Sequence, residues 1–138
     1  PGQLSGFWAN WGYDHRCTAV RVPDARGKGT RLEHRMADGA ANPYTATACV
    51  LQAARLGVVN DLTPPPAETG NGLDEINTEV CCPPTLEAAL DALEADTEFV
   101  EAVGADMVAQ FTAIKRAEWE RFTTSVTDWE LNEYLPFH

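Results

Sequence analysis

The segment at residues 30–36 limits the possible folds more than any other part of the chain, because its charges alternate. In an extended strand, successive side chains point to opposite faces, so Arg31, Glu33 and Arg35 share one face. Long charged side chains on a sheet face are costly to desolvate unless partners neutralise them. An anionic ligand together with a metal cation would satisfy two arginines and one glutamate. The segment therefore predicts a strand that displays a nucleotide and metal site.

The opposite face of the same strand carries Leu32, His34 and Met36. We expect His34 to be a packed imidazole rather than a ligand, because it points away from the charged row. From the residues alone, the three charges are equally compatible with a solvated edge strand that binds nothing.

The charge of the chain is unevenly distributed. The net charge is -11, which argues against binding to nucleic acid or to an anionic membrane. Residues 1–35 nevertheless contain six of the ten basic residues and only three of the 21 acids. This basic segment would attract phosphates or carboxylates. With 138 residues and an apolar fraction of 44%, the chain is sufficient for one domain with a moderate core.

The four cysteines lack the spacing of a metal site, since no Cys-x-x-Cys pair occurs; they are Cys17, Cys49, Cys81 and Cys82. The sequence also has no signal peptide and no apolar run of membrane-spanning length. We therefore expect reduced thiols and a cytoplasmic protein, with a disulfide as the alternative.

The first part of the chain predicts an antiparallel hairpin after a loop at residues 1–15. Residues 16–23 favour a strand that ends at Pro23, and a turn at 24–29 connects it to the strand at 30–36. Arg16 and Arg21 would face opposite sides of a regular strand. If both arginines contribute to one site, we therefore expect Arg16 to lie at the very start of the strand, beside that site.

The second part predicts helices joined by a Pro-rich loop at residues 60–84. The first helix is expected to be buried, to begin after Asn42 with Pro43, and to end near Arg55–Leu56 with Gly57 in a left-handed conformation. Further helices are expected after Thr85, from Asp96 to Gly104, over 106–122, and from 127 or 128 to 135.

Two motifs carry a resemblance to a known family. Arg31-Leu32-Glu33-His34-Arg35, followed by Ala41-Asn42-Pro43-Tyr44, closely resembles the Arg-x-Glu-x-Arg and Ala-Asn-Pro-Tyr motifs of glutamine synthetases. The Pro-Gly at the start of the chain and the stretch from residue 11 to residue 23 are also similar to that family. The resemblance implies an α+β fold, in which residues 1–138 form the C-terminal portion of a catalytic domain with a curved antiparallel sheet and C-terminal helices.

The resemblance also implies an activity, that of an ATP-dependent carboxylate–amine ligase. In this family ATP phosphorylates the γ-carboxylate of glutamate, and ammonia or an organic amine then displaces phosphate to form the amide. Divalent ions assist, and a carboxylate ligand suits Mg²⁺ or Mn²⁺. Family members are homo-oligomers of stacked rings, without a nucleic acid or membrane partner.

By position in the motifs, each charged residue of the hairpin receives an expected role. Glu33 matches a metal ligand, and Arg35 matches the arginine that holds glutamate. Arg16 and Arg21 match arginines on the ATP phosphates, and Arg16 is also expected to act catalytically on the acyl phosphate. Arg31 matches a position beside the nucleotide.

Two departures from the family concern substrate and regulation. Leu4 stands where many glutamine synthetases carry a glutamate that attracts ammonium, which favours an organic amine as acceptor. The 60–84 loop has no tyrosine, so control by adenylylation is not expected. His15 replaces an asparagine common in the family.

The family's other metal-binding glutamates and its N-terminal domain have no counterpart in the sequence. We therefore expect these 138 residues to be inactive alone and to belong to a longer protein. The alternative is a non-catalytic scaffold with a glutamine-synthetase-like fold.

Overall fold

The computed structural model describes residues 7–72 and 77–137. The chain divides into two compact units, Pro1–Pro83 and Pro84–His138, and each is treated by itself. Leu4 and its predicted effect on the acceptor lie outside the described residues. Among the residues described, no helix is both long and apolar enough to cross a membrane.

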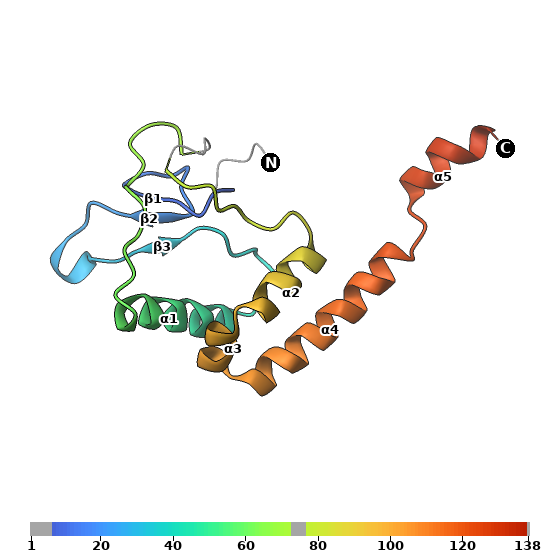
Figure 1. The fold of residues 1–138 in the computed structure, drawn as a ribbon. Coiled ribbons are helices and arrows are strands. Elements are labelled where there is room, and N and C mark those ends of the chain that lie inside the picture. The colour runs from blue at the N-terminus through green and yellow to red at the C-terminus, as the bar shows by residue number, and fades with distance from the viewer. Residues whose placement is uncertain (1–6, 73–76, 138) are drawn as a thin grey trace. The chain divides into compact units, whose positions relative to one another are not determined.

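The first unit contains a small sheet of three strands in the order β1-β2-β3 (Figure 1). Its strands are β1 (Trp11–Tyr13), β2 (Val20–Val22) and β3 (Glu33–His34). The predicted antiparallel pairing of β2 with β3 is confirmed, although both strands are shorter than expected. The prediction of a loop throughout residues 1–15 is wrong, because β1 pairs in parallel with β2.

The connection between β2 and β3 contains Pro23, which has no N–H for a ladder, and a 3-10 turn, η1 (Gly27–Gly29). The register places Arg21 directly opposite Glu33 and Val20 opposite His34. Side chains of directly opposed residues lie on the same face of a sheet. The register therefore brings the charges of two strands together.

The outer side of β1 is covered by part of the Pro-rich loop, through four hydrogen bonds. They join Trp11 Nε1 to the oxygen of Pro65 (2.7 Å), the N–H of Glu68 to the oxygen of Trp11 (2.8 Å), His15 Nε2 to the oxygen of Gly70 (2.7 Å) and Asn10 Nδ2 to the oxygen of Gly72 (2.8 Å). Gly12 allows this approach, since a Cβ there would lie 3.0 Å from the backbone oxygen of Glu68.

Helix α1 (Pro43–Val59) begins as predicted. Asn42 Oδ1 accepts hydrogen bonds from the N–H groups of Tyr44 and Thr45, at 3.0 and 3.3 Å. The predicted end is wrong, because the helix continues past Gly57. The left-handed position is taken instead by Asp61, whose φ is 51°. The expectation of a buried helix is also wrong in this structure, because α1 has no buried residue.

The second unit consists of helices α2 (Leu86–Ala95), α3 (Thr97–Val103), α4 (Ala105–Thr123) and α5 (Asp128–Tyr134), followed by a 3-10 turn, η2 (Leu135–Phe137). The predicted caps are confirmed at Thr85 and Asp96, which accept from N–H groups at 3.1 and 3.0 Å. Thr127 and Glu130 form a reciprocal capping box at the start of α5.

The core of the second unit is small and lies between α2 and α4. Leu90 of α2 is 2% exposed, and Val108 and Thr112 of α4 are also buried. Arg116 of α4 reaches back to α2 and pairs with Asp91 at 2.7 Å. These contacts pack α2 against α4.

Candidate functional site: an ion-paired cluster on the sheet

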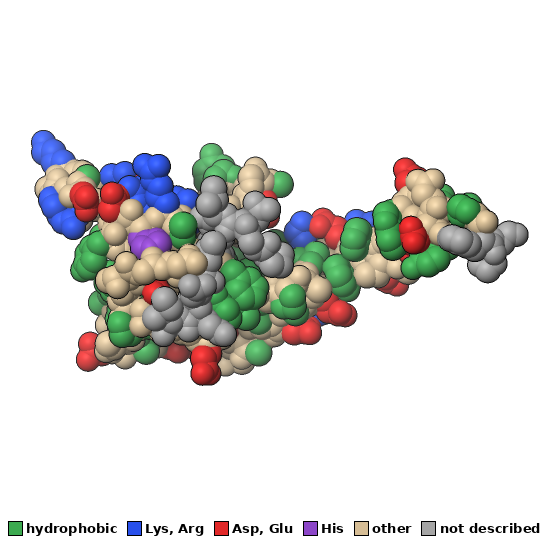
Figure 2. Space-filling model, turned by 90° about the horizontal axis from the view of Figure 1, so that it is seen from above, with side chains coloured by type: hydrophobic (Ala, Val, Ile, Leu, Met, Phe, Trp, Pro, Cys, Tyr) green, Lys and Arg blue, Asp and Glu red, His purple; other side chains and the backbone are tan. Residues whose placement is uncertain are grey.

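Glu33 of β3 is the centre of an ion-paired cluster in the first unit. Arg21 of β2 donates from Nη1 to Glu33 Oε2 at 2.8 Å, and Arg31 donates from Nη2 to Glu33 Oε1 at 3.0 Å. Arg21 also donates from Nη2 to Asp14, the residue after β1. We call Asp14, Arg21, Arg31 and Glu33 the Glu33 cluster. Figure 2 shows basic and acidic side chains gathered together beside the connection between β2 and β3.

The members of the cluster differ in exposure. The side chain of Arg21 is 13% exposed and that of Glu33 is 28% exposed, whereas those of Asp14 and Arg31 are 49% and 51% exposed. Arg21 is therefore the most enclosed charge, and it is held between two carboxylates. The side chain of Arg31 is half-exposed and, among the described residues, forms an ion pair with Glu33 alone.

The hydrogen bond from Arg21, supported by that from Arg31, holds the pKa of Glu33 below its usual value. The same bonds to Glu33 and Asp14 raise the pKa of Arg21. Glu33 is therefore a carboxylate at neutral pH, which is the form that binds a cation. Each of its two oxygens already accepts a hydrogen bond from a guanidinium group, that of Arg21 or that of Arg31.

Two guanidinium groups of this region have donors without acceptors. The Nε atoms of Arg21 and Arg35 are buried and have no hydrogen-bond partner among the described residues. The backbone N–H of Arg35 donates to the oxygen of Ala19 at 2.8 Å, so its backbone is fixed beside β2. A buried donor that lacks an acceptor is costly, and an oxyanion is a strong acceptor for guanidinium groups. The unfilled donors therefore fit an anionic ligand.

Arg16 is placed differently from the other predicted site residues. It is exposed in the turn between β1 and β2, and its side chain has no ion pair within the described part of the chain. The structure thus brings together Arg21, Arg31 and Glu33, and leaves Arg16 outside their cluster.

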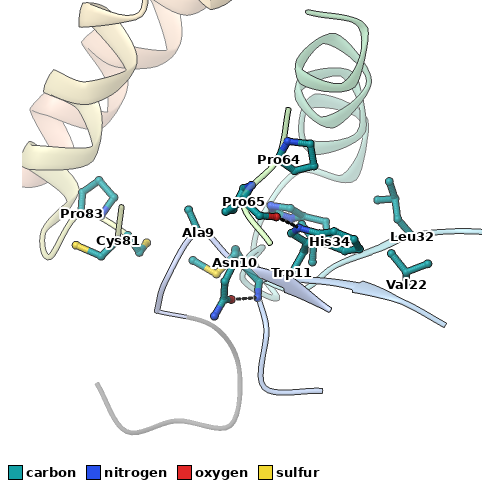
Figure 3. A pocket seen from close by; sticks show the side chains of 14 residues that line it. Ala9, Asn10, Trp11, Val22, Leu32, His34, Pro64, Pro65, Cys81 and Pro83 are labelled. Carbon is teal, nitrogen blue, oxygen red and sulfur yellow. Dashed lines mark hydrogen bonds between the residues drawn. The ribbon is translucent and has the colours of Figure 1, made fainter. Parts of the chain in front are cut away.

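The opposite face of the sheet borders an apolar cavity of about 640 Å³ (Figure 3). Leu32, His34 and Met36 line it together with Val22 and Trp11. The structure agrees with the predicted alternation for Arg31 and Glu33, which pair with each other, and for Leu32, His34 and Met36, which border the cavity. No ion pair within the described residues joins Arg35 to the Glu33 cluster.

Of the two carboxylates in the cluster, Glu33 is the one that the family motif assigns to a divalent ion, and it is ionised at neutral pH. The described residues contain no group of three or more His, Cys, Asp or Glu side chains able to hold a metal ion. Glu33 therefore fits as one oxygen ligand of a metal, and the remaining ligands of such a site would come from outside the described residues.

Sequence reasoning missed two residues of the first unit. Asp14 was not predicted to pair with Arg21, and its only signal was an isolated acid within a basic segment. Glu68 was assigned to a surface loop, yet it is 3% exposed and neither carboxylate oxygen has a hydrogen-bond partner among the described residues. No local pattern in the Pro-rich loop indicates that burial.

Comparisons of the chain with known proteins all indicate the same family. A family model described as "Glutamine synthetase, catalytic domain" matches residues 1–134. Proteins named glutamine synthetase from Methanocaldococcus jannaschii and Thermotoga maritima are 40% and 35% identical to the chain, each over 98% of it. A solved structure titled "Apo GmaS without ligand" covers 93% of the chain with a TM-score of 0.76 and 32% identity.

The matched region is a minor part of each of these proteins. The chain spans 31% and 32% of the two glutamine synthetases and 30% of the chain in the solved structure. Within that region the match runs through the Glu33 cluster and the helices alike, and it agrees with the observed α+β class. The chain belongs to the glutamine synthetase family and corresponds to part of its catalytic domain.

Proposed function

We propose that the chain is the C-terminal portion of an ATP-dependent ligase that forms a γ-glutamyl amide from glutamate and ammonia or an organic amine. ATP would transfer its γ-phosphoryl group to the γ-carboxylate of glutamate, giving γ-glutamyl phosphate and ADP. The nitrogen of the acceptor would then attack the acyl carbon, lose a proton and displace phosphate. Family membership supports the ligase class, and the Glu33 cluster supports the site.

The observation that carries the proposal is an ionised glutamate held by Arg21 and Arg31, together with buried Nε donors of Arg21 and Arg35 that have no acceptor among the described residues. Phosphoryl transfer requires mainly that negative charge be positioned and neutralised. Arg21 and Arg31 would bind the nucleotide phosphates, and Arg35 would bind the glutamate. Arg16, which is exposed, would reach the ATP phosphates and the acyl phosphate from the turn. Each assignment follows from the family motif, and for Arg21 and Arg35 the unfilled donors support it as well.

A bound Mg²⁺ or Mn²⁺ would neutralise phosphate charge, and Glu33 would contribute one of its ligands. Each oxygen of Glu33 keeps a lone pair beyond the one that its arginine partner uses, and a metal ion there would weaken both ion pairs. A guanidinium held less tightly by Glu33 would then be available to a phosphate oxygen. Exchange of partners within one cluster would thus couple the cation to the nucleotide.

The identity of the amine acceptor depends on the residues at the ammonium site. An apolar Leu4 at the family's ammonium-attracting position favours an organic amine over ammonia. We also propose that the complete protein assembles as rings with neighbouring subunits, as family members do.

The test uses the complete protein that contains this chain. Phosphate release and amide formation are measured with ATP, Mg²⁺ and glutamate, with ammonium or one of a panel of primary amines as acceptor. Amide formation that requires both ATP and glutamate supports the ligase. No amide with any acceptor would favour the non-catalytic scaffold instead. Efficient turnover with millimolar ammonium alone would remove the preference for an organic amine.

A further inference from the structure

Asp14 has an unusual backbone conformation for its position. Its φ is 47°, and within the described residues only Asp61 shares a positive φ among residues other than glycine. Its backbone N–H donates to the oxygen of Val22 at 2.8 Å, which fixes the residue beside the end of β2. Left-handed conformations of non-glycine residues cost free energy and tend to occur at functional sites. The backbone therefore fixes the direction of the Asp14 side chain, and its carboxylate forms an ion pair with Arg21.

Asp14 and Glu33 differ in how many arginines they pair with in the Glu33 cluster. Glu33 accepts from two arginines with two different oxygens, whereas the Asp14 carboxylate accepts from Arg21 alone within the described residues. If Glu33 binds a metal ion, its hold on Arg21 weakens, because the carboxylate must share its charge. Asp14 is then the carboxylate that still holds the guanidinium.

We propose that Asp14 is a positioning residue that keeps Arg21 oriented for the nucleotide phosphates, whatever Glu33 binds. This inference depends on the proposed function for its consequence, but the restraint on Arg21 is a property of the cluster itself. Arginine has a long side chain with several rotatable bonds, and a preorganised guanidinium loses less entropy when it binds an anion. Asp14 supplies that preorganisation from the end of β1, on the side of β2 away from β3.

The main test variant is Asp14→Gly, because glycine adopts a positive φ without strain and removes the carboxylate. Asp14→Asn keeps an acceptor oxygen and tolerates the same backbone, but removes the charge. The matched control is Asp24→Asn, since Asp24 is exposed and has no ion pair among the described residues. All variants are made in the complete protein.

The first readout is the rate at which phenylglyoxal modifies Arg21, followed by peptide mass spectrometry. Arg121, which is exposed on α4, serves as the internal reference. We expect Asp14→Gly to speed modification of Arg21 relative to Arg121 by roughly fivefold or more, because a charge-assisted bond is lost. Asp14→Asn should lie between Asp14→Gly and the wild type, and Asp24→Asn should match the wild type. An unchanged Arg21 rate in Asp14→Gly would overturn the proposal.

The second readout separates positioning from a general structural effect. We expect Asp14→Gly to raise the KM for ATP about tenfold, while the KM for glutamate stays within about twofold of the wild type. A parallel rise of both constants, or no rise of either, would overturn the assignment to the nucleotide. If the wild type forms no amide, the proposed function fails, and the modification rate still decides whether Asp14 restrains Arg21.

Discussion

Arg35→Ala probes the proposed glutamate site most directly. Its backbone N–H bonds Ala19 at 2.8 Å without help from the side chain, so truncation leaves the pairing beside β2 intact. The side chain offers a buried Nε donor that no described residue accepts from. One charge-assisted hydrogen bond is worth about 1.5–3 kcal/mol, and one preorganised donor in a transition state about 3–4 kcal/mol. We therefore expect a loss of about 2–4 kcal/mol of transition-state stabilisation.

That loss corresponds to a decrease in kcat/KM for glutamate of roughly 30-fold to 900-fold. Steady-state kinetics of the complete protein, with glutamate varied at saturating ATP, measure it. The KM for ATP should change little, because Arg21 and Arg31 are assigned to the nucleotide. Arg55→Ala is the matched control, since Arg55 is exposed on α1 and bonds only the side chain of Gln52 at 2.8 Å. A kcat/KM for glutamate within about twofold of the wild type in Arg35→Ala would refute the assignment.

Further predictions concern Glu33, Leu90 and Glu68. Its arginines lower the pKa of Glu33 from an ordinary value of about 4.5. The stabilising contribution of Glu33 is therefore fully present above pH 4.5 and is lost as the pH falls through the lowered pKa of the folded state. Glu33→Gln should therefore lose less stability than the wild type on acidification, measured by thermal melts from pH 6 to pH 3, and equal losses would contradict this. Glu33→Gln should also abolish metal-dependent turnover, which kinetics with varied Mg²⁺ would show. Leu90→Ala should lower the free energy of unfolding of the helical unit by about 2–3 kcal/mol in urea titrations, because Leu90 is 2% exposed, and the partly exposed Leu86→Ala should cost less. Glu68→Gln should raise the free energy of unfolding by about 1 kcal/mol in urea titrations, because an amide costs less to bury than a carboxyl group whose oxygens have no partner among the described residues. A decrease would contradict this.

Features with local causes could be predicted from the sequence. Helix starts at Asn42, Thr85 and Asp96 depend on one side chain that accepts from N–H groups two or three residues later. The end of α1 was predicted wrongly, because Gly57 is able to terminate a helix but is not obliged to. The N–H groups of Asn60 and Leu62 bond the oxygens of Leu56 and Gly57 at 2.9 Å, which moves the left-handed residue to Asp61.

The charged row of the site was also readable from local sequence. Alternation separates Arg31 and Glu33 from Leu32 and His34 wherever the segment is extended, and the pairing of Arg31 with Glu33 agrees with it. The family resemblance is confirmed by the match over residues 1–134. The individual roles of these side chains remain predictions for the kinetic experiments.

The amino-acid sequence alone determined the helix starts, the alternating faces of residues 31–36 and the family, because each depends on neighbours within a few positions. Only the tertiary structure decided that Asp14 and Glu33 enclose Arg21 and that Glu68 is buried beside β1. Those relations join residues of different strands and loops through strand register and loop packing. A partner in another element leaves no periodic signal, so the pairing of Asp14 with the proposed nucleotide arginine became visible only when the strands were aligned.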